Sequence, residues 1–75
     1  MKNLVEFIAR SLVDDPEAVR VAEIETDQLT TYEIQVAPDD VGKLIGRQGR
    51  IVKAIRSVVR ASAARQGKRV AVEVL

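Results

Sequence analysis

The sequence contains no cysteine, no histidine and no tryptophan, and its only aromatic residues are Phe7 and Tyr32. Without cysteine there is neither a disulfide framework nor thiolate chemistry. Without cysteine and histidine, the usual zinc sites and the Ser-His and Cys-His nucleophilic pairs are excluded. Two aromatic residues are also too few for RNA recognition by bases stacked on an aromatic sheet. These absences leave few catalytic mechanisms open.

The chain also lacks any long hydrophobic run. No apolar stretch approaches the roughly 20 residues that a membrane-spanning helix needs, and the N-terminus has the pattern of a helix rather than of a signal peptide. What is present is globular in composition, since 47% of the 75 residues are hydrophobic and 31% are charged. We therefore expect one soluble, cytoplasmic domain over residues 1–75.

The net charge of +1 conceals a strong asymmetry between the two halves of the chain. Residues 1–40 carry three basic and ten acidic residues, a net charge of −7, whereas residues 41–75 carry nine basic residues and one acidic residue, a net charge of +8. Such asymmetry indicates a polyanionic partner. Alternatively, the two halves of a small domain simply attract one another.

Hydrophobic periodicity predicts three helices and three strands in the order α-β-β-α-α-β. In the first strand, Val19 and Val21 share one face while Ala22 and Ile24 share the other, which indicates a bulge or an imprecise start. Gly67 stands where a left-handed helix C-cap belongs. The predicted elements are a helix over residues 2–13, strands over 18–26 and 31–36, a short helix over 41–45 that follows Pro38-Asp39-Asp40 as a start signal, a long helix over 50–66, and a strand over 70–74. This order predicts an α+β fold, a three-stranded sheet with helices packed on one face.

Residues 41–60 contain the candidate binding site. Gly46 and Gly49 bracket Arg47 and Gln48 between two helical segments. Glycine lets another backbone approach closely, and the free N–H groups expected at the start of the next helix favour phosphate. A plain corner between two helices has the same pattern. The other common phosphate loops, G-x-x-x-x-G-K-[ST] and G-x-G-x-x-G, are absent.

The helix after the glycines combines an apolar and a basic face at about 100° per residue. The apolar arc consists of Ile51, Val52, Ile55, Val58 and Val59, and the opposite stripe of Arg50, Lys53, Arg56 and Arg60. A basic stripe alone is typical of a solvated face. Because this one follows directly from the glycine pair, it favours nucleic-acid binding.

The run over residues 41–56 resembles the signature of a K-homology (KH) domain, with an apolar pair, then G-x-x-G, then a helix. The element order resembles the type II, bacterial form, and the resemblance covers essentially all 75 residues. It implies that about four nucleotides of single-stranded RNA or DNA bind, with the loop clamping the backbone and the bases in an apolar groove. The residues that it assigns to RNA binding are Lys43, Ile45, Gly46, Arg47, Gln48, Gly49, Arg50, Ile51 and Lys53.

The resemblance also implies a protein partner. Small stand-alone bacterial KH proteins are regarded as RNA chaperones that are linked to cell shape, and they form homodimers or heterodimers with a larger KH protein. In this chain Ala54, Val58 and Ala61 line a stripe of small residues beside the apolar arc, and we take them as the candidate dimer interface. High helix propensity alone also explains the two alanines.

Two functions therefore compete. The first is a single-stranded RNA-binding protein, for which the resemblance implies a role as an RNA chaperone and post-transcriptional regulator. The second is a protein-interaction module that retains the KH fold with little RNA affinity, which the acidic first half keeps open. An enzyme is disfavoured because Asp, Glu, Lys and Tyr32 are the only acid–base candidates. We expect no metal, cofactor, small-molecule substrate or membrane partner.

Overall fold

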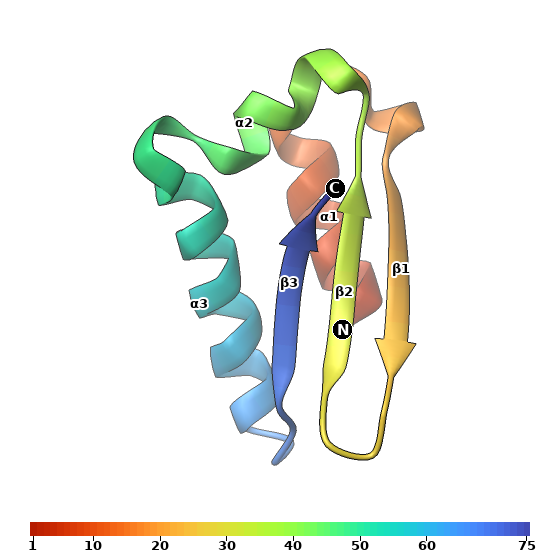
Figure 1. Cartoon of the computed structure of the whole chain (residues 1–75), viewed down its shortest axis with the longest axis vertical. Coiled ribbons are helices and arrows are strands. Elements are labelled where there is room, and N and C mark those ends of the chain that lie inside the picture. The colour runs from red at the N-terminus through yellow and green to blue at the C-terminus, as the bar shows by residue number, and fades with distance from the viewer.

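The computed structural model describes residues 1–75 and confirms the predicted element order (Figure 1). One-turn 3₁₀ helices at Pro16–Ala18, Pro38–Asp40 and Arg47–Gly49 connect the main elements. The helices are α1 (Lys2–Leu12), α2 (Val41–Ile45) and α3 (Arg50–Ala64), and the strands are β1 (Arg20–Glu25), β2 (Thr30–Gln35) and β3 (Val70–Val74). None of the helices has the length and apolar character needed to cross a bilayer.

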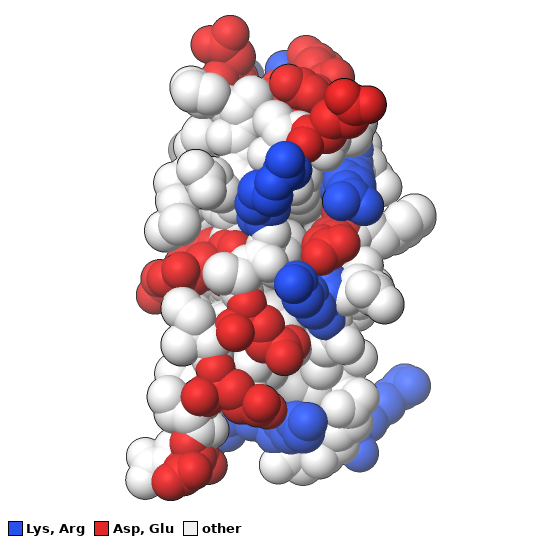
Figure 2. Space-filling view, turned by 90° about the vertical axis from the view of Figure 1, so that its right-hand side faces the viewer, with Lys and Arg blue, Asp and Glu red and all other residues white.

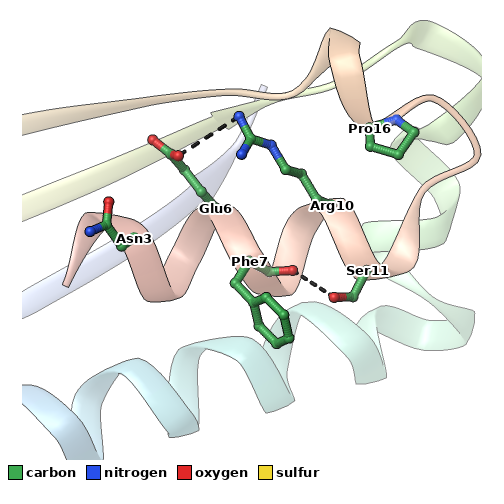
Figure 3. Close-up of a pocket in the computed structure, with 6 residues that line it drawn as sticks. All are labelled: Asn3, Glu6, Phe7, Arg10, Ser11 and Pro16. Atoms are coloured by element: carbon green, nitrogen blue, oxygen red, sulfur yellow. Dashed lines mark hydrogen bonds and ion pairs between the residues drawn. The ribbon is translucent and has the colours of Figure 1, made fainter.

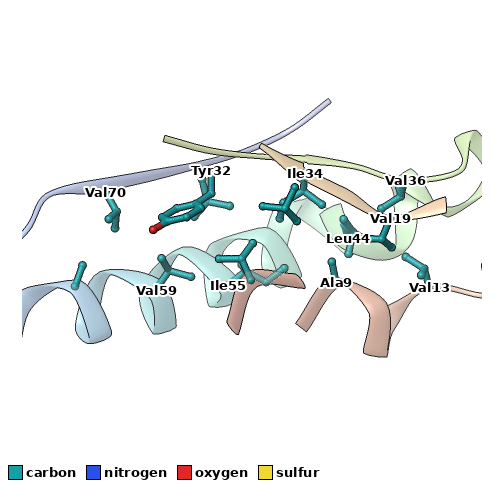
Figure 4. Close-up of a cluster of buried hydrophobic side chains, with 14 residues drawn as sticks. Ala9, Val13, Val19, Tyr32, Ile34, Val36, Leu44, Ile55, Val59 and Val70 are labelled. Carbon is teal, nitrogen blue, oxygen red and sulfur yellow. The ribbon is translucent and has the colours of Figure 1, made fainter. Parts of the chain in front are cut away.

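The sheet is mixed, in the order β1-β2-β3. Strands β1 and β2 form an antiparallel hairpin, whereas β2 and β3 are parallel. A parallel pair needs a long crossover, which α2 and α3 provide here. In the central strand, Tyr32 lies opposite Glu23 of β1 and Val72 of β3. All three helices lie on one face of the sheet, as predicted (Figures 1 and 4).

The hydrophobic core lies between this face and the helices (Figure 4). Alternation along β2 buries Tyr32 and Ile34 on the inner side, because successive strand residues point to opposite faces. Fully buried apolar side chains of this size each contribute about 1.5–3 kcal/mol relative to exposure. The helix residues that meet them are Val5 and Ala9 of α1, Leu44 of α2, and Ile55, Val59 and Ala63 of α3.

Strand β1 begins later than predicted, at Arg20, because Pro16–Ala18 forms a 3₁₀ turn instead of extended backbone. Its pairing with β2 is continuous from Arg20 to Glu25. The mismatched apolar pattern therefore reflects an imprecise start and not a bulge.

Helix α3 ends two residues earlier than predicted, but Gly67 caps it as expected. Gly67 has φ +69°, its N–H donates to the carbonyl of Ala64 (3.1 Å), and the N–H of Lys68 donates to that of Ala63 (3.0 Å). These two bonds form a Schellman motif, which satisfies carbonyls at the end of the helix.

The apolar arc predicted for α3 is partly wrong. Val52, Ile55 and Val59 are buried, but Ile51 is only half-buried and Val58 is 49% exposed. Ala63, which the prediction omitted, is fully buried. The arc is shifted because α3 packs on the sheet through these buried residues, which leaves Val58 on the flank that faces α1.

Candidate nucleic-acid interface

The GXXG loop (residues 46–49) forms the corner between α2 and α3 (Figure 1). The N–H of Gly46 donates to the carbonyl of Gly42 (2.9 Å) and closes α2, and the N–H of Gly49 donates to the carbonyl of Gly46 (3.1 Å). The side chains of Arg47 and Gln48 are exposed at the tip, as predicted.

Gly46 cannot be replaced by another residue without disturbing the loop. Its backbone, at φ +75° and ψ 171°, lies in a region that is essentially restricted to glycine. A Cβ at this position would lie 2.5 Å from Cγ1 of Ile51. Ile51 therefore packs directly against the loop backbone and holds one side of the corner.

Gln48 adopts a left-handed conformation that residues other than glycine rarely adopt, at φ 57° and ψ 26°. Gly49 follows with φ +74°. Together they turn the chain sharply into α3. Backbone of this kind clusters at ligand-binding sites, and here the Gln48 side chain is also exposed.

The tight turn changes one expectation for phosphate binding. The N–H groups of Gly49 and Arg50 donate to the carbonyls of Gly46 and Arg47 within the turn. The sequence predicted free N–H donors at the start of this helix, but these two N–H groups are already paired. The positive end of the α3 dipole and the side chains of Arg47 and Arg50 remain as sources of positive potential.

The Lys43 ammonium group is paired with two carboxylates. Its Nζ lies 2.7 Å from Oδ2 of Asp14 and 3.1 Å from Oδ1 of Asp40. Asp40 is only 2% exposed, and its other oxygen accepts the N–H of Asp15 (3.1 Å). These contacts fasten α2 to the segment that follows α1. The RNA-binding role of Lys43 stays a prediction.

Asp40 directly precedes α2, where it is buried and makes no side-chain cap bond to the helix. Burial raises the pKa of the Asp40 carboxyl, but the hydrogen bonds from Lys43 and from the backbone N–H of Asp15 lower it more, so the pKa lies below its usual value. The hydrogen bond to Asp14 and that to Asp40 raise the pKa of Lys43. Both shifts mean that the contacts within the cluster favour the charged forms of Asp40 and Lys43.

The basic stripe of α3 is not a uniform solvated face. Arg56 is half-buried and its Nε donates to the carbonyl of Val72 on the edge of β3 (3.2 Å). Arg50, Lys53 and Arg60 are exposed. None of these four residues makes an ion pair, since the ion pairs of the chain involve only Arg10 and Lys43. The stripe therefore keeps its positive potential.

An apolar groove separates α1 from α3. Phe7 is 70% exposed and Val58 49% exposed, and Figure 3 shows the Phe7 ring directed from α1 toward α3. The groove is lined by Leu4, Phe7, Ile8 and Leu12 of α1 and by Arg50, Ile51, Ala54, Ile55 and Val58 of α3. Of the predicted dimer residues, Ala54 and Val58 line it, whereas Ala61 is exposed beyond it.

The α1 side of this groove was missed from the sequence. The spacing of Leu4, Phe7 and Ile8 predicts an amphipathic helix, but it does not show which flank of that helix meets α3. On the side of α1 opposite α3 the surface is polar, with an ion pair between Glu6 and Arg10 at 3.8 Å (Figure 3). The apolar character is thus confined to the flank that faces α3.

The charge asymmetry of the sequence becomes a separation in space. Strand β1 lies at one edge of the sheet and α3 lies beyond the other (Figure 1). Acidic side chains run along the face at the β1 edge, with a few basic ones among them (Figure 2). The acidic side chains of β1 also act on their neighbour Tyr32: burial raises its pKa to about 12, and Glu23 and Glu25 contribute to the rise. A phosphate backbone is therefore favoured on the α3 side and disfavoured at β1.

Comparison with known proteins agrees with this geometry. The KhpA/KhpB, KH domain family matches residues 2–74. The chain is 53% identical to the RNA-binding protein KhpA of Clostridium acetobutylicum over the full length of both, and 44% identical to KhpA of Aquifex aeolicus over 100% of this chain and 95% of that one.

Among solved structures, the crystal structure of Aquifex aeolicus Era Y63A bound to GDP.AlF4- superposes with a TM-score of 0.72. The match covers 97% of this chain and 28% of Era, at 21% identity, so it concerns the fold alone. The fold, the GXXG corner and the relatives agree, and the chain belongs to the KhpA/KhpB family of KH-domain proteins.

Proposed function

We propose that this chain binds single-stranded RNA, and in the same way single-stranded DNA, through the GXXG loop. The observation that carries the proposal is the corner itself, where Gly46 occupies a backbone conformation and a space that admit no side chain. The exposed Arg47 and Gln48 stand at its tip. The relatives named RNA-binding protein KhpA support the assignment.

Each part of the corner has a separate task in this proposal. The two glycines allow the tight corner that presents Arg47 and Gln48 at the tip, where the phosphate backbone binds. Arg47, Arg50 and Lys53 supply charge without a competing carboxylate, which makes binding salt-dependent through counterion release. The half-buried Ile45 and Ile51 offer apolar surface for the bases beside the loop.

The test measures the fluorescence anisotropy of a labelled single-stranded RNA over a salt series. In the test variant, Arg47→Asp is combined with Gln48→Asp, which spares both glycines. We expect its affinity to fall at least about tenfold, because two anions face the phosphates. A charge-matched control combines Arg10→Asp with Asn3→Asp on the outward face of α1 (Figure 3). Equal losses in the two variants would move the site elsewhere.

A chaperone and regulatory role fits a site of this size. About four nucleotides carry little sequence information, so one such domain binds many RNAs rather than one target. An annealing assay with two complementary RNAs tests this role. The parent is expected to change the annealing rate and the loop variant is not. No effect of the parent would contradict the role, and an equal effect of both proteins would place it outside the loop.

The second candidate function, protein association, rests on the groove between α1 and α3. The exposed Phe7 and Val58 make an apolar surface that water covers in the isolated chain. It fits a second copy of the chain or a larger KH protein such as KhpB, with Ala54 and Val58 at the contact and Ala61 beside it. Sedimentation of Val58→Asp tests it, with Ser57→Asp on the adjacent exposed position as the control. An unchanged mass for folded Val58→Asp would remove Val58 from the interface.

A further inference from the structure

Three charged side chains join the base of the GXXG loop to the segment that follows α1. The Nζ of Lys43 in α2 lies 2.7 Å from Oδ2 of Asp14 and 3.1 Å from Oδ1 of Asp40. We propose that this charged cluster (Asp14, Asp40 and Lys43) holds the GXXG loop in its RNA-binding position, so that Lys43 is a positioning residue and not a phosphate contact. This inference rests on the proposed RNA binding.

Helix α2 depends on tertiary contacts for its position. It has five residues, of which only Leu44 is buried, and isolated helices shorter than about 12 residues are marginal in water. The N–H of Gly46 donates to the carbonyl of Gly42 (2.9 Å), so the first residue of the loop is bonded into the last turn of α2. A displacement of α2 therefore displaces the loop.

The segment on the other side of the cluster is well fixed. It is bounded by the buried Val13 and Val19 and contains a 3₁₀ turn. The Oδ2 of Asp40 accepts the N–H of Asp15 in this segment (3.1 Å), and Asp40 is only 2% exposed. Removing Lys43 would leave this carboxylate buried without its cation, which is a costly state. The cluster therefore holds α2 against a rigid support.

The surroundings of Lys43 are unsuited to phosphate. Its ammonium group has three N–H donors, and it donates hydrogen bonds to both Asp14 and Asp40. The three side chains together carry one net negative charge, which repels an anion. Arg47 and Arg50 at the loop, by contrast, make no ion pair. The arginines are therefore the phosphate contacts, in place of the contact by Lys43 that the sequence predicted.

The first experiment weakens the cluster at Asp14, whose side chain is 82% exposed, because loss of an exposed ion pair costs little stability. Asp14→Asn is compared with Asp39→Asn, which removes the same charge from an exposed residue without an ion pair. Affinity for a labelled oligouridine is measured by fluorescence anisotropy over a salt series. We expect Asp14→Asn to bind about two- to fivefold more weakly than Asp39→Asn, because fewer molecules hold the loop in position.

The opposite order would overturn the proposal. If Lys43 contacted phosphate, its release from Asp14 would make Asp14→Asn the tighter binder, with a salt slope steeper by about 1. Equal affinities of the two variants would likewise contradict a positioning role for the cluster.

A second set of variants removes and restores the cation. Lys43→Gln is expected to bind about five- to tenfold more weakly than the parent at every salt concentration, with the salt slope unchanged. Lys43→Arg, which keeps the charge for both ion pairs, is expected to retain the affinity of the parent. Lys53→Gln is the matched control, since it removes an exposed cation without an ion pair beside Gly49 and is expected to reduce the slope by about 1. The same reduction in Lys43→Gln would show a phosphate contact and overturn the proposal.

Amide hydrogen exchange without RNA tests the cluster separately from binding. In Lys43→Gln the N–H of Gly46, which closes α2, is expected to exchange at least about fivefold faster than in the parent. The N–H of Gly67, bonded to Ala64 at the far end of α3 (3.1 Å), is the control for global unfolding and is expected to keep its rate. Unchanged exchange at Gly46 would overturn the proposal. If instead Arg47→Asp combined with Gln48→Asp bound RNA as the parent does, the loop site would be wrong, while faster exchange at Gly46 would still support the hold of the cluster on α2.

Discussion

Helix α3 has two flanks of opposite character on either side of one buried face. The flank toward β3 carries Arg56 and Arg60, and the flank toward α1 carries Ala54 and Val58. The neighbouring element explains the difference. The edge of β3 offers an unpaired carbonyl, at Val72, which an arginine satisfies, whereas α1 offers apolar side chains.

This division separates two kinds of partner. RNA on the β3 flank and a protein in the α1 groove would touch different residues of the same helix. Arg50 and Ile51 are the exceptions, since both follow the GXXG loop and also line the groove. Away from these two residues the proposed activities use different surfaces, and variants farther along either flank are expected to leave the other activity intact.

The largest expected effect concerns the corner that supports both flanks. Gly46→Ala places a Cβ 2.5 Å from Cγ1 of Ile51 in a glycine-only conformation. We expect the free energy of unfolding to fall by about 3 kcal/mol or more, measured by urea denaturation. Gly42→Ala is the matched control, because its Cβ meets nothing within 4 Å and alanine favours a helix by up to about 1 kcal/mol. A smaller loss at Gly46 than at Gly42 would contradict the geometry.

The next effect tests whether the flanks are independent. Val58→Asp is expected to lose self-association while keeping its affinity for RNA within about twofold, because the charge lies on the flank that faces away from β3. Lys53→Gln combined with Arg60→Gln is expected to show the reverse. Both variants are measured by sedimentation and by RNA anisotropy. If each change weakened both activities equally, the two flanks would form one surface.

Sequence reasoning predicted the element order and the GXXG corner because both depend on local patterns. The alternation of Tyr32 and Ile34 and the spacing of Gly46 and Gly49 are properties of neighbouring residues. The hydrogen bonds at Gly67 likewise lie within a single turn. Features of this kind can be predicted from the sequence without knowledge of distant contacts.

Sequence reasoning did not reveal what depends on neighbours far along the chain. Lys43 meets Asp14 across 29 positions, and Arg56 meets Val72 across 16. A helical projection distinguishes inward from outward, but it does not show which flank faces α1. For that reason the projection did not separate Val58, which lies on the α1 flank, from the buried residues of the apolar arc, nor Arg56 from the exposed residues of the basic stripe.

The third prediction concerns the cluster that anchors α2. Because the pKa of Asp40 lies below its ordinary value of 3.8, the folded state binds its proton less readily than the unfolded state. The stabilisation is complete above about pH 4 and is lost as the pH falls through the folded pKa. In acid denaturation, the unfolding free energies of the parent and of Asp40→Asn are expected to converge. Parallel curves would show that Asp40 does not titrate with folding, and Asp39→Asn at the exposed neighbour is the control.

The smallest expected effect concerns two acidic residues near the C-terminal end of α3. Glu25 and Asp27 line a surface hollow together with Lys68 and Arg69 without forming an ion pair. Glu25→Gln combined with Asp27→Asn removes two screened repulsions, so affinity for a 12-nucleotide RNA is expected to rise about two- to threefold at low salt.

The same removal of charge at Glu6 and Asp39 serves as the control for the general field of the protein. The gain at Glu25 and Asp27 is expected to exceed that of the control and to disappear with a 4-nucleotide RNA, which occupies the loop alone. A gain that is independent of RNA length would mean that the acids act through net charge, and the β3 flank would then end at the loop and not at Arg60. A gain confined to the long RNA would extend that flank beyond the apolar groove, which α3 lines only as far as Val58.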